Sequence, residues 1–306
     1  MAASPPVAPE PVVASGSALA FAPGKLILFG EHAVVYGHPA VALAVDRGTT
    51  VSLVAVDGPT RIVAADVEDP RLLPALCTIL PSEGLGVTLR STLPVGRGMG
   101  SSAALAVALV RAWARWQGRS LDLDEIHQAG FQVERVFHGN PSGVDHAVSA
   151  RGGAVCYWRR PPGPEIRAVP VAPLPLVVLD TGRAGDTGVQ VAGVASRRPG
   201  VDPLLAAIGA LALAQLPALA QGDLPSLGAA MRENHRLLQG IGVSTPALDA
   251  LVALALAHGA LGAKLAGAGG GGVVVALVPE PGPLLAAAAA AGVDAFPVGV
   301  HPSQER

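Results

Sequence analysis

Runs of apolar residues divide the first hundred positions into candidate strands. Residues 18–29 are apolar on both sides of a Pro-Gly pair, which predicts a strand, a turn and a second strand that ends at a polar segment. The stretch 39–56 continues with β-branched residues, and residues 84–96 form a further strand that leads into a glycine-rich loop. The N-terminal part of the chain therefore predicts a sheet.

Helical spacing replaces this pattern after the loop. Residues 101–118 have the length of a helix and end with arginines before a glycine, and residues 121–139 form a second, amphipathic helix. Residues 204–220 are the longest apolar stretch, but Gln215 and Pro217 interrupt it. We therefore expect a soluble helix that bends or stops near Pro217 rather than a membrane span.

The C-terminal half mixes strands and helices without a strict βαβ alternation. We expect a strand at 176–182, helices between 202 and 259, a loop and strand at 263–278, a helix at 281–292 and a last strand at 294–300. The proline-rich stretch 159–175 has little periodic signal, so we interpret it as the connection between two lobes. An α+β fold with two lobes is favoured over a doubly wound sheet.

The length of the chain agrees with this division. Its 306 residues suffice for two lobes with a real core. We expect a disordered N-terminal tail at 1–17, which is rich in Pro, Ala and Ser, an N-terminal lobe at 18–170 and a C-terminal lobe at 171–306. The tail lacks a basic segment ahead of an apolar one, so no secretory signal is expected.

Composition narrows the class of protein. Half of the residues are apolar and 14% are charged, which indicates a compact enzyme rather than a disordered chain. The net charge is −2 and no basic stripe is present, which argues against nucleic acid as a partner. Cys77 and Cys156 stand far apart and outside any metal-ligand spacing, so a reducing, cytoplasmic setting is favoured over a disulfide or zinc scaffold.

The glycine-rich loop, LPVGRGMGSSAAL at 93–105, has two interpretations. It is neither a Walker A sequence nor a dinucleotide-binding fingerprint, because no lysine follows the last glycine and the glycine spacing differs. Its glycines would let backbone amides approach a phosphate, and the helix behind would add its positive end. Ser101 or Ser102 then either caps that helix or turns a hydroxyl towards Mg²⁺. An ordinary turn with a serine cap is an equal alternative for the loop alone.

A lysine precedes one of the most apolar runs of the chain. Lys25 stands directly before LILF, and Glu31 and His32 follow that run. A lysine that enters a buried strand is costly to desolvate unless a carboxylate or a phosphate pairs with it. The alternative is a surface lysine followed by a solvated loop.

Two carboxylates lie downstream, on different elements. Glu134 is on the helix at 121–139, whereas Asp145 follows an Asn-Pro-Ser-Gly turn, so only the fold can bring them into one site. Phosphoryl transfer to an alcohol needs one carboxylate to hold Mg²⁺ and another to accept the hydroxyl proton. A surface glutamate and a helix-capping aspartate remain the alternative.

A second glycine-rich loop, at 267–272, contains five glycines and one alanine directly before a strand. A segment with this many glycines loses much backbone conformational entropy when it becomes ordered. We expect it either to approach a phosphate or to pack on the first glycine loop, and a mobile linker is the alternative.

The order of these segments resembles that of the GHMP kinases, the group of galactokinase, homoserine kinase, mevalonate kinase and phosphomevalonate kinase. The segments PGK-x-x-L-x-GEH, P-x-x-x-G-x-G-S-S-A-A and AGAGGGG occur in the family's order, and the similarity runs from about residue 21 to residue 300. It implies an ATP- and Mg²⁺-dependent kinase of a small alcohol, often a homodimer. It also implies an N-lobe similar to domain 2 of ribosomal protein S5 and a ferredoxin-like C-lobe.

The sequences of three segments most resemble those of the family members that phosphorylate the C5 hydroxyl of mevalonate in isoprenoid biosynthesis. These segments are GEHAVVYG, ERVFHGNPSGVD and NHRLLQGIGVSTPALDAL. Phosphomevalonate, homoserine or a sugar is the alternative acceptor. A phosphorylated acceptor would need further cations near Asp145, for which Arg183 and Lys264 are candidates. A catalytically silent relative, the remaining alternative, would lack Lys25, Glu134 or Asp145, and all three are present.

The resemblance also implies roles for individual residues. Asp145 resembles the residue that accepts the hydroxyl proton, and Lys25 the lysine beside it that keeps it ionised. Ser102 and Glu134 match the Mg²⁺ ligands. The phosphate-binding turn corresponds to Pro94, Gly96, Gly98, Met99, Gly100, Ser101, Ser102 and Ala103. The substrate pocket corresponds to Lys25, Glu31, His32 and Asp145, with Gly269, Gly270 and Gly271 closing on it.

Two positions depart from the family's pattern. Met99 stands where leucine is usual, a near-isosteric change that should leave the backbone path unaltered. His146 follows Asp145 where asparagine is common. We expect His146 to touch the substrate or to tune Asp145.

Overall fold

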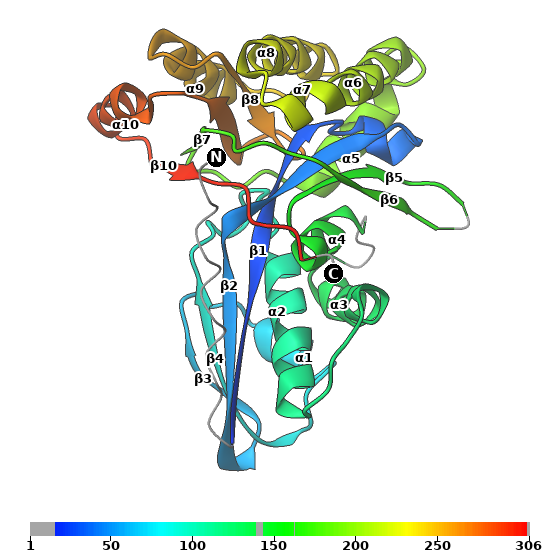
Figure 1. Cartoon of the computed structure of the whole chain (residues 1–306), viewed down its shortest axis with the longest axis vertical. Helices are drawn as coiled ribbons and strands as arrows, with labels where there is room; N and C mark the ends of the chain where they lie inside the picture. Colours follow the sequence, from blue (N-terminus) through cyan, green and yellow to red (C-terminus); the bar gives the residue numbers. More distant parts are fainter. Residues whose placement is uncertain (1–15, 139–142, 162, 305–306) are drawn as a thin grey trace.

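The computed structural model describes residues 16–138, 143–161 and 163–304. Within these ranges two lobes lie one above the other, each with its own sheet (Figure 1). The predicted tail up to residue 15 and most of the Asn-Pro-Ser-Gly turn, at 139–142, lie outside the described residues.

The N-terminal lobe contains a six-stranded sheet of order β3-β4-β2-β5-β6, in which β1 also pairs with β2. Only the β3–β4 pair is parallel among the described strands. The strands are β1 (Ser17–Phe29), β2 (Ala40–Pro59), β3 (Arg61–Ala65), β4 (Glu83–Ser91), β5 (Ala154–Trp158) and β6 (Glu165–Val169). The 3-10 turn η1 (Ala33–Tyr36) lies between β1 and β2.

Four helices of this lobe lie within the described residues. They are α1 (Leu72–Leu76), α2 (Ser101–Trp116), α3 (Leu123–His138) and α4 (Val144–Arg151). The alanine-rich helix α2 packs on β1 and β2 and is itself covered by α3 and α4 (Figure 1). Because α2 is buried along most of its length, its small side chains let the sheet and the outer helices approach closely.

The C-terminal lobe contains a four-stranded antiparallel sheet of order β10-β7-β9-β8. The strands are β7 (Leu176–Asp180), β8 (Gly262–Ala266), β9 (Val273–Leu277) and β10 (Ala295–Val298). Counted within the lobe, the order is 4-1-3-2, and helices connect the first strand to the second and the third to the fourth. This is the ferredoxin-like arrangement, so the α+β fold with two lobes is confirmed.

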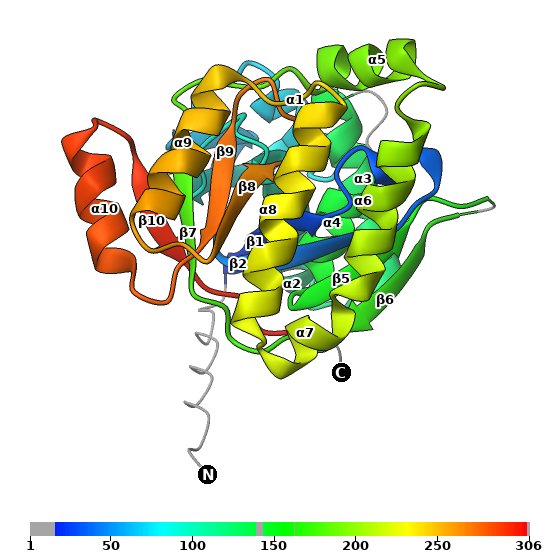
Figure 2. The ribbon, with the colours of Figure 1, turned by 90° about the horizontal axis from the view of Figure 1, so that it is seen from above.

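In the part of the C-terminal lobe that the structure describes, six helices follow β7 or join the other strands. They are α5 (Thr187–Arg197), α6 (Asp202–Ala214), α7 (Leu216–Gln221), α8 (Leu224–Gly240), α9 (Pro246–Ala257) and α10 (Pro281–Ala290). Helices α8 and α9 lie across β8 and β9, and α6 lies beside α8 (Figure 2). One hydrophobic cluster contains residues of both sheets, for example Leu28 of β1 and Val275 of β9, so the two lobes share a core.

The apolar run at 202–221 is, within the described residues, the one helical stretch long and apolar enough to cross a membrane by length and composition. A third of its most apolar window is buried. The helix is interrupted at Gln215, two residues before the proline that the sequence singles out, and α6 packs against α8, β1 and β2. The expected break is confirmed.

Three local predictions are wrong. Residues 17–29 form one continuous strand rather than strand, turn and strand, because the Pro-Gly pair is absorbed as a bulge opposite β2. The proline-rich stretch contains β6, an edge strand that tolerates flanking prolines. Helix α5 was not predicted, although Asp186 caps it by accepting a hydrogen bond from the Val189 amide.

The last described residues cross back to the N-terminal lobe. His301 donates its amide to the Ala44 carbonyl at 2.8 Å, and Gln304 donates its amide to the Arg151 carbonyl at 2.7 Å. Residues 299–304, which the sequence placed with the C-terminal lobe, therefore close the contact between the lobes.

Candidate active site

The first glycine loop turns sharply into α2. Gly96, Gly98 and Gly100 have φ angles of +70°, +80° and +73°, which other residues rarely adopt. Gly100 is the N-cap of α2, and no side chain caps the helix. The N-terminus of α2 thus opens onto the glycine turn without a side-chain cap, the arrangement that binds phosphate at a helix N-terminus. The serine-capped turn, one of the two interpretations of the sequence, is excluded.

Lys25 lies beneath this turn and points to Asp145. Its amide donates to the Met99 carbonyl at 2.9 Å, and a Cβ added at Gly100 would lie 2.9 Å from Lys25 Cγ. Lys25 Nζ is 3.2 Å from Asp145 Oδ1. The lysine side chain is 5% exposed and the aspartate 30% exposed, so the pair is buried on one side and open on the other. The lysine expected to need a carboxylate partner has one.

Helix α4 presents Asp145 in its first turn. The helix is held against β1 by Ser149, whose hydroxyl donates to the Pro23 carbonyl at 2.6 Å. This bond sets the distance between the strand that carries Lys25 and the helix that carries Asp145.

Two oxygen-bearing side chains lie together on α2 and α3. Ser102 Oγ donates to Glu134 Oε1 at 3.3 Å, and Glu134 is buried. A hydroxyl and a carboxylate are the hard oxygen donors that Mg²⁺ prefers, and Mg²⁺ in kinases completes its shell with water and phosphate oxygens. Among the described residues no group of three or more His, Cys, Asp or Glu side chains forms a metal site. The donors present therefore fit an ion shared with a bound nucleotide.

The second glycine loop packs directly on the first. A Cβ at Gly98 would lie 3.5 Å from the Ala266 carbonyl, and one at Gly272 would lie 2.9 Å from the Arg97 carbonyl. Arg97 Nε also contacts Asp180 Oδ2 at 3.0 Å, which joins the first loop to the end of β7. The loop at 267–272 is thus a packed element between β8 and β9 and not a linker.

Glu31 has other surroundings than the sequence suggested. Its side chain is fully buried, forms an ion pair with Lys264 and accepts a hydrogen bond from Asn234 Nδ2 at 3.0 Å. Lys264 also donates to the Ile27 carbonyl at 3.3 Å. Glu31 therefore joins β1 to β8 and α8 instead of lining an open pocket. Burial lowers the pKa of Lys264, and the Glu31 carboxylate counteracts this shift.

His32, next to Glu31, lies against the second glycine loop. It has a φ of +59°, which is unusual for a residue with a side chain, and its Nε2 donates to the Ala268 carbonyl at 2.7 Å. Burial lowers the pKa of His32, so the ring is neutral at pH 7 with its proton on Nε2. Its Nδ1 is then an acceptor.

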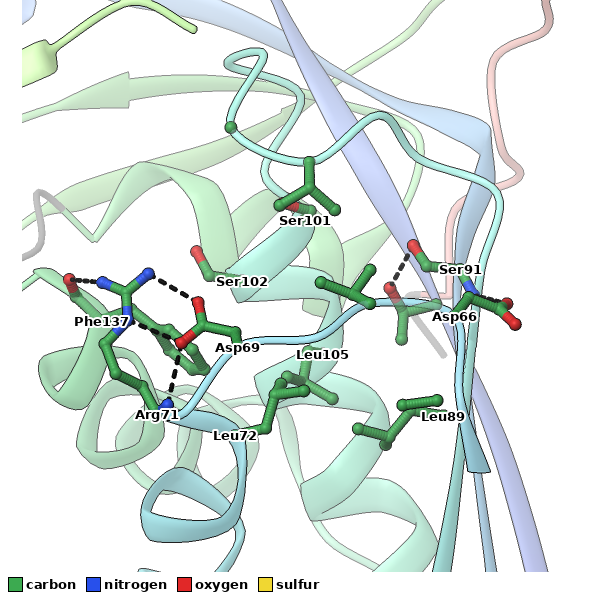
Figure 3. A pocket seen from close by; sticks show the side chains of 15 residues that line it. Asp66, Asp69, Arg71, Leu72, Leu89, Ser91, Ser101, Ser102, Leu105 and Phe137 are labelled. Atoms are coloured by element: carbon green, nitrogen blue, oxygen red, sulfur yellow. Dashed lines mark hydrogen bonds and ion pairs between the residues drawn. The ribbon is translucent and has the colours of Figure 1, made fainter. Parts of the chain in front are cut away.

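A cavity of about 150 Å³ opens beside Ser101 and Ser102 (Figure 3). Leu72, Leu89, Leu105 and Phe137 are among the apolar side chains that line it. Arg71 lies at one side, where its guanidinium binds both oxygens of Asp69 at 3.0 and 2.7 Å and lowers the pKa of that carboxyl. Of the lining residues, Gly96, Ser101 and Ser102 were singled out from the sequence as binding residues. The apolar residues and Arg71 were not, because they come from separate elements without a shared motif.

His146 follows Asp145 on α4. Its Nδ1 lies 2.7 Å from Glu134 Oε2, and the ring is completely buried. The structure places the ring against Glu134, and the expectation that it touches the substrate or tunes Asp145 stays a prediction.

Comparison with known proteins agrees with the fold and the motifs. Residues 67–153 match the GHMP kinases N terminal domain, and residues 215–296 match the GHMP kinases C terminal model. The mevalonate kinase of Thermococcus sibiricus is 38% identical over 301 residues, covering 86% of this chain and 89% of that protein. The mevalonate kinase of Pyrococcus horikoshii is 39% identical over 300 residues, covering 85% and 88%.

Solved structures show the same relationship. The L. major mevalonate kinase in complex with R-mevalonate superposes with a TM-score of 0.85 at 27% identity, over 94% of this chain and 97% of the other. The Methanococcus jannaschii mevalonate kinase superposes with a TM-score of 0.83 at 25% identity, over 95% and 99%. The chain belongs to the GHMP kinase family, and the resemblance inferred from its motifs is confirmed.

Proposed function

We propose that this chain is a mevalonate kinase, which transfers the γ-phosphoryl group of ATP to the C5 hydroxyl of mevalonate and forms 5-phosphomevalonate for isoprenoid biosynthesis. The curated relatives that cover most of its length carry that name, and a similar solved structure holds R-mevalonate. The observation that carries the proposal is the Lys25–Asp145 pair, partly open to solvent and placed directly below the glycine turn.

Asp145 takes the proton in the proposed reaction. The C5 hydroxyl oxygen bonds to the γ-phosphorus of ATP while the bond between that phosphorus and the β,γ-bridging oxygen breaks, and ADP leaves. The hydroxyl proton passes to Asp145. Lys25, 3.2 Å from Asp145, stabilises its ionised form before the transfer and any negative charge on the attacking oxygen during it.

The nucleotide is assigned to the α2 side of the site. The amides around Gly98, Met99, Gly100, Ser101 and Ala103, after Pro94 and Gly96, bind the phosphates, and the cavity beside Ser102 accepts the adenine. Ser102 and Glu134 would hold Mg²⁺, which when bound neutralises charge on the phosphates. The apolar walls of the cavity suit a flat heterocycle.

The acceptor side is assigned to His32 and the second glycine loop. His32 offers Nδ1 as an acceptor for a hydroxyl, and Gly269 and Gly270 let the loop approach closely. We assign Glu31 an indirect role, because its ion pair with Lys264 holds the segment that carries His32.

The same ion pair withdraws one of the candidate cations for a phosphorylated acceptor. Lys264, one of two cations that the sequence offered for a second phosphate, is completely buried and committed to Glu31. Galactokinase and phosphomevalonate kinase structures share the fold at 18% identity, which carries no information about the acceptor.

The proposal is tested by ADP release with mevalonate, phosphomevalonate, homoserine and galactose as acceptors. We expect rapid turnover with mevalonate alone. No turnover with mevalonate, or faster turnover with another acceptor, would overturn the assignment of the substrate.

We also propose that the enzyme acts in the cytoplasm as a homodimer, without nucleic acid or membrane partners. Both cysteines are free thiols, which suits a reducing compartment. Sedimentation of the purified protein tests the dimer.

A further inference from the structure

The buried carboxylate of Glu134 has a separate partner for each oxygen. Ser102 contacts Oε1 at 3.3 Å, and His146 Nδ1 contacts Oε2 at 2.7 Å. The side chain of Glu134 is 3% exposed and that of His146 is 0% exposed. A charge removed from water to this extent needs donors, and the contact with His146 is the shorter of the two.

The short helix α4 carries one residue that contacts Lys25 and another that contacts Glu134. Asp145 and His146 are neighbours on α4, so their side chains leave the helix about 100° apart. Asp145 points to Lys25, whereas His146 points to Glu134. The helix therefore relates the position of the Lys25–Asp145 pair to that of the Ser102–Glu134 pair.

The rest of the His146 ring is held by aromatic contacts. The ring centre of His127 lies 4.3 Å away, and that of Phe131 lies 5.5 Å away in an edge-on orientation. Within the described part of the chain, His146 Nε2 is buried without a hydrogen-bond partner, as is His127 Nδ1. The bond to Glu134 is thus the polar anchor of this ring, and Nδ1 donates because the carboxylate accepts.

We propose that His146 is a positioning residue for Glu134. Its Nδ1–H binds Oε2 and so turns Oε1 towards Ser102, where the two oxygens meet a metal ion. His146 acts through Glu134 and contacts neither the acceptor nor Asp145. The inference rests on the proposed function in one respect only, the use of Ser102 and Glu134 as metal ligands.

The test compares three substitutions in the full chain. His146→Phe fills the ring's place without a donor, His146→Asn keeps an N–H donor, and His127→Phe keeps the aromatic contact at a residue that does not touch Glu134. The primary measurement is Mn²⁺ affinity in the presence of a non-hydrolysable ATP analogue, followed by electron paramagnetic resonance. Nucleotide affinity without metal is measured alongside.

We expect His146→Phe to weaken Mn²⁺ binding by about 10- to 100-fold, as loss of an outer-shell partner typically does. Metal-free nucleotide binding should stay unchanged, His146→Asn should recover most of the loss, and His127→Phe should bind like the wild type. In a Glu134→Gln background, His146→Phe should add little, because its effect passes through Glu134. In kinetics, the Mg²⁺ requirement should rise more than the KM for mevalonate.

Wild-type Mn²⁺ affinity in His146→Phe, or an equal loss of metal-free nucleotide binding, would overturn the inference. If His146→Phe fails to fold, His146→Leu compared with His146→Asn gives the same contrast. An enzyme that shows the expected Mn²⁺ effects but does not turn over mevalonate would refute the proposed substrate and leave the role of His146 standing.

Discussion

Two lysine–carboxylate pairs differ in their exposure to solvent. Each has one member on β1 or just after it. Lys25 and Asp145 lie 3.2 Å apart, and 30% of the aspartate side chain is exposed. Lys264 and Glu31 are completely buried, and Asn234 and the Ile27 carbonyl satisfy further polar atoms of the pair.

The two pairs differ in solvent access, and this difference limits the chemistry that each can perform. The Lys25–Asp145 pair can meet a substrate and change its protonation state. The Lys264–Glu31 pair cannot take a proton from a substrate, or give one to it, without leaving a buried charge unpaired, so it serves to join the lobes. Similar side chains in one segment are thus accessible to a substrate at one end and sealed in the core at the other.

The largest effect is expected on turnover, from a substitution in the Lys25–Asp145 pair. Asp145→Asn removes the proton acceptor and should lower turnover by about 10²- to 10⁴-fold, while ATP affinity and the free energy of unfolding change little. Steady-state kinetics and nucleotide binding measure this. Turnover within a few-fold of the wild type would contradict the role assigned to Asp145.

Lys264→Met should act on stability instead. It leaves the Glu31 carboxylate buried without its cation, which typically costs about 3–5 kcal/mol. Urea unfolding followed by circular dichroism measures the loss. The matched control is Lys25→Met, which should cost about 0–1 kcal/mol, because its partner is partly solvated, but should slow turnover. Equal losses in both variants would show that burial does not distinguish the pairs.

Replacement of both members of the buried pair sharpens this test. In the double variant Glu31→Gln, Lys264→Met no charge is left unpaired, and glutamine retains an acceptor for Asn234. We expect it to recover about 1–3 kcal/mol relative to Lys264→Met alone. Additive losses in the unfolding experiment would instead mean that the two side chains do not interact.

A smaller loss of stability than for Lys264→Met is expected at an arginine–carboxylate contact, between Arg97 and Asp180. Arg97 is 21% exposed and Asp180 is 8% exposed, between the two extremes. Arg97→Ala should cost about 1 kcal/mol of the free energy of unfolding, because Asp180 keeps the Gly182 amide as a donor at 2.8 Å. A loss above that for Lys264→Met would reverse the order that burial predicts.

Local signals in the sequence predicted much of the fold. The strands before the glycine loop, the helix after it and the break near Pro217 follow from apolar spacing and from Gly and Pro. The Pro-Gly pair at 23–24 was misread as a turn, because nothing local reveals that β2 is available to pair across it. Helix α5 lies in a glycine-containing segment whose only clear local signal is the Asp186 cap.

The site was predictable where a motif is contiguous. Gly96, Gly98 and Gly100 adopt the left-handed conformations that only glycine adopts readily, and the sequence alone indicated a turn of that kind. The cavity beside Ser102 was not predictable, since its walls come from β2, β3, β4, α1, α2, α3 and the loops between them. The partner of His146 also lies on another helix.

The sequence by itself determined the residue types of the reaction and the order of their motifs, because a glycine turn, a helix after it and ionisable side chains are properties of short segments. Only the tertiary structure decided which charges pair and which of them meet water. Lys264 and Glu31 are 233 positions apart, and Lys25 and Asp145 belong to different elements. Desolvation depends on the atoms that surround a group in space, and it turned one pair into a candidate for catalysis and the other into a bond between lobes.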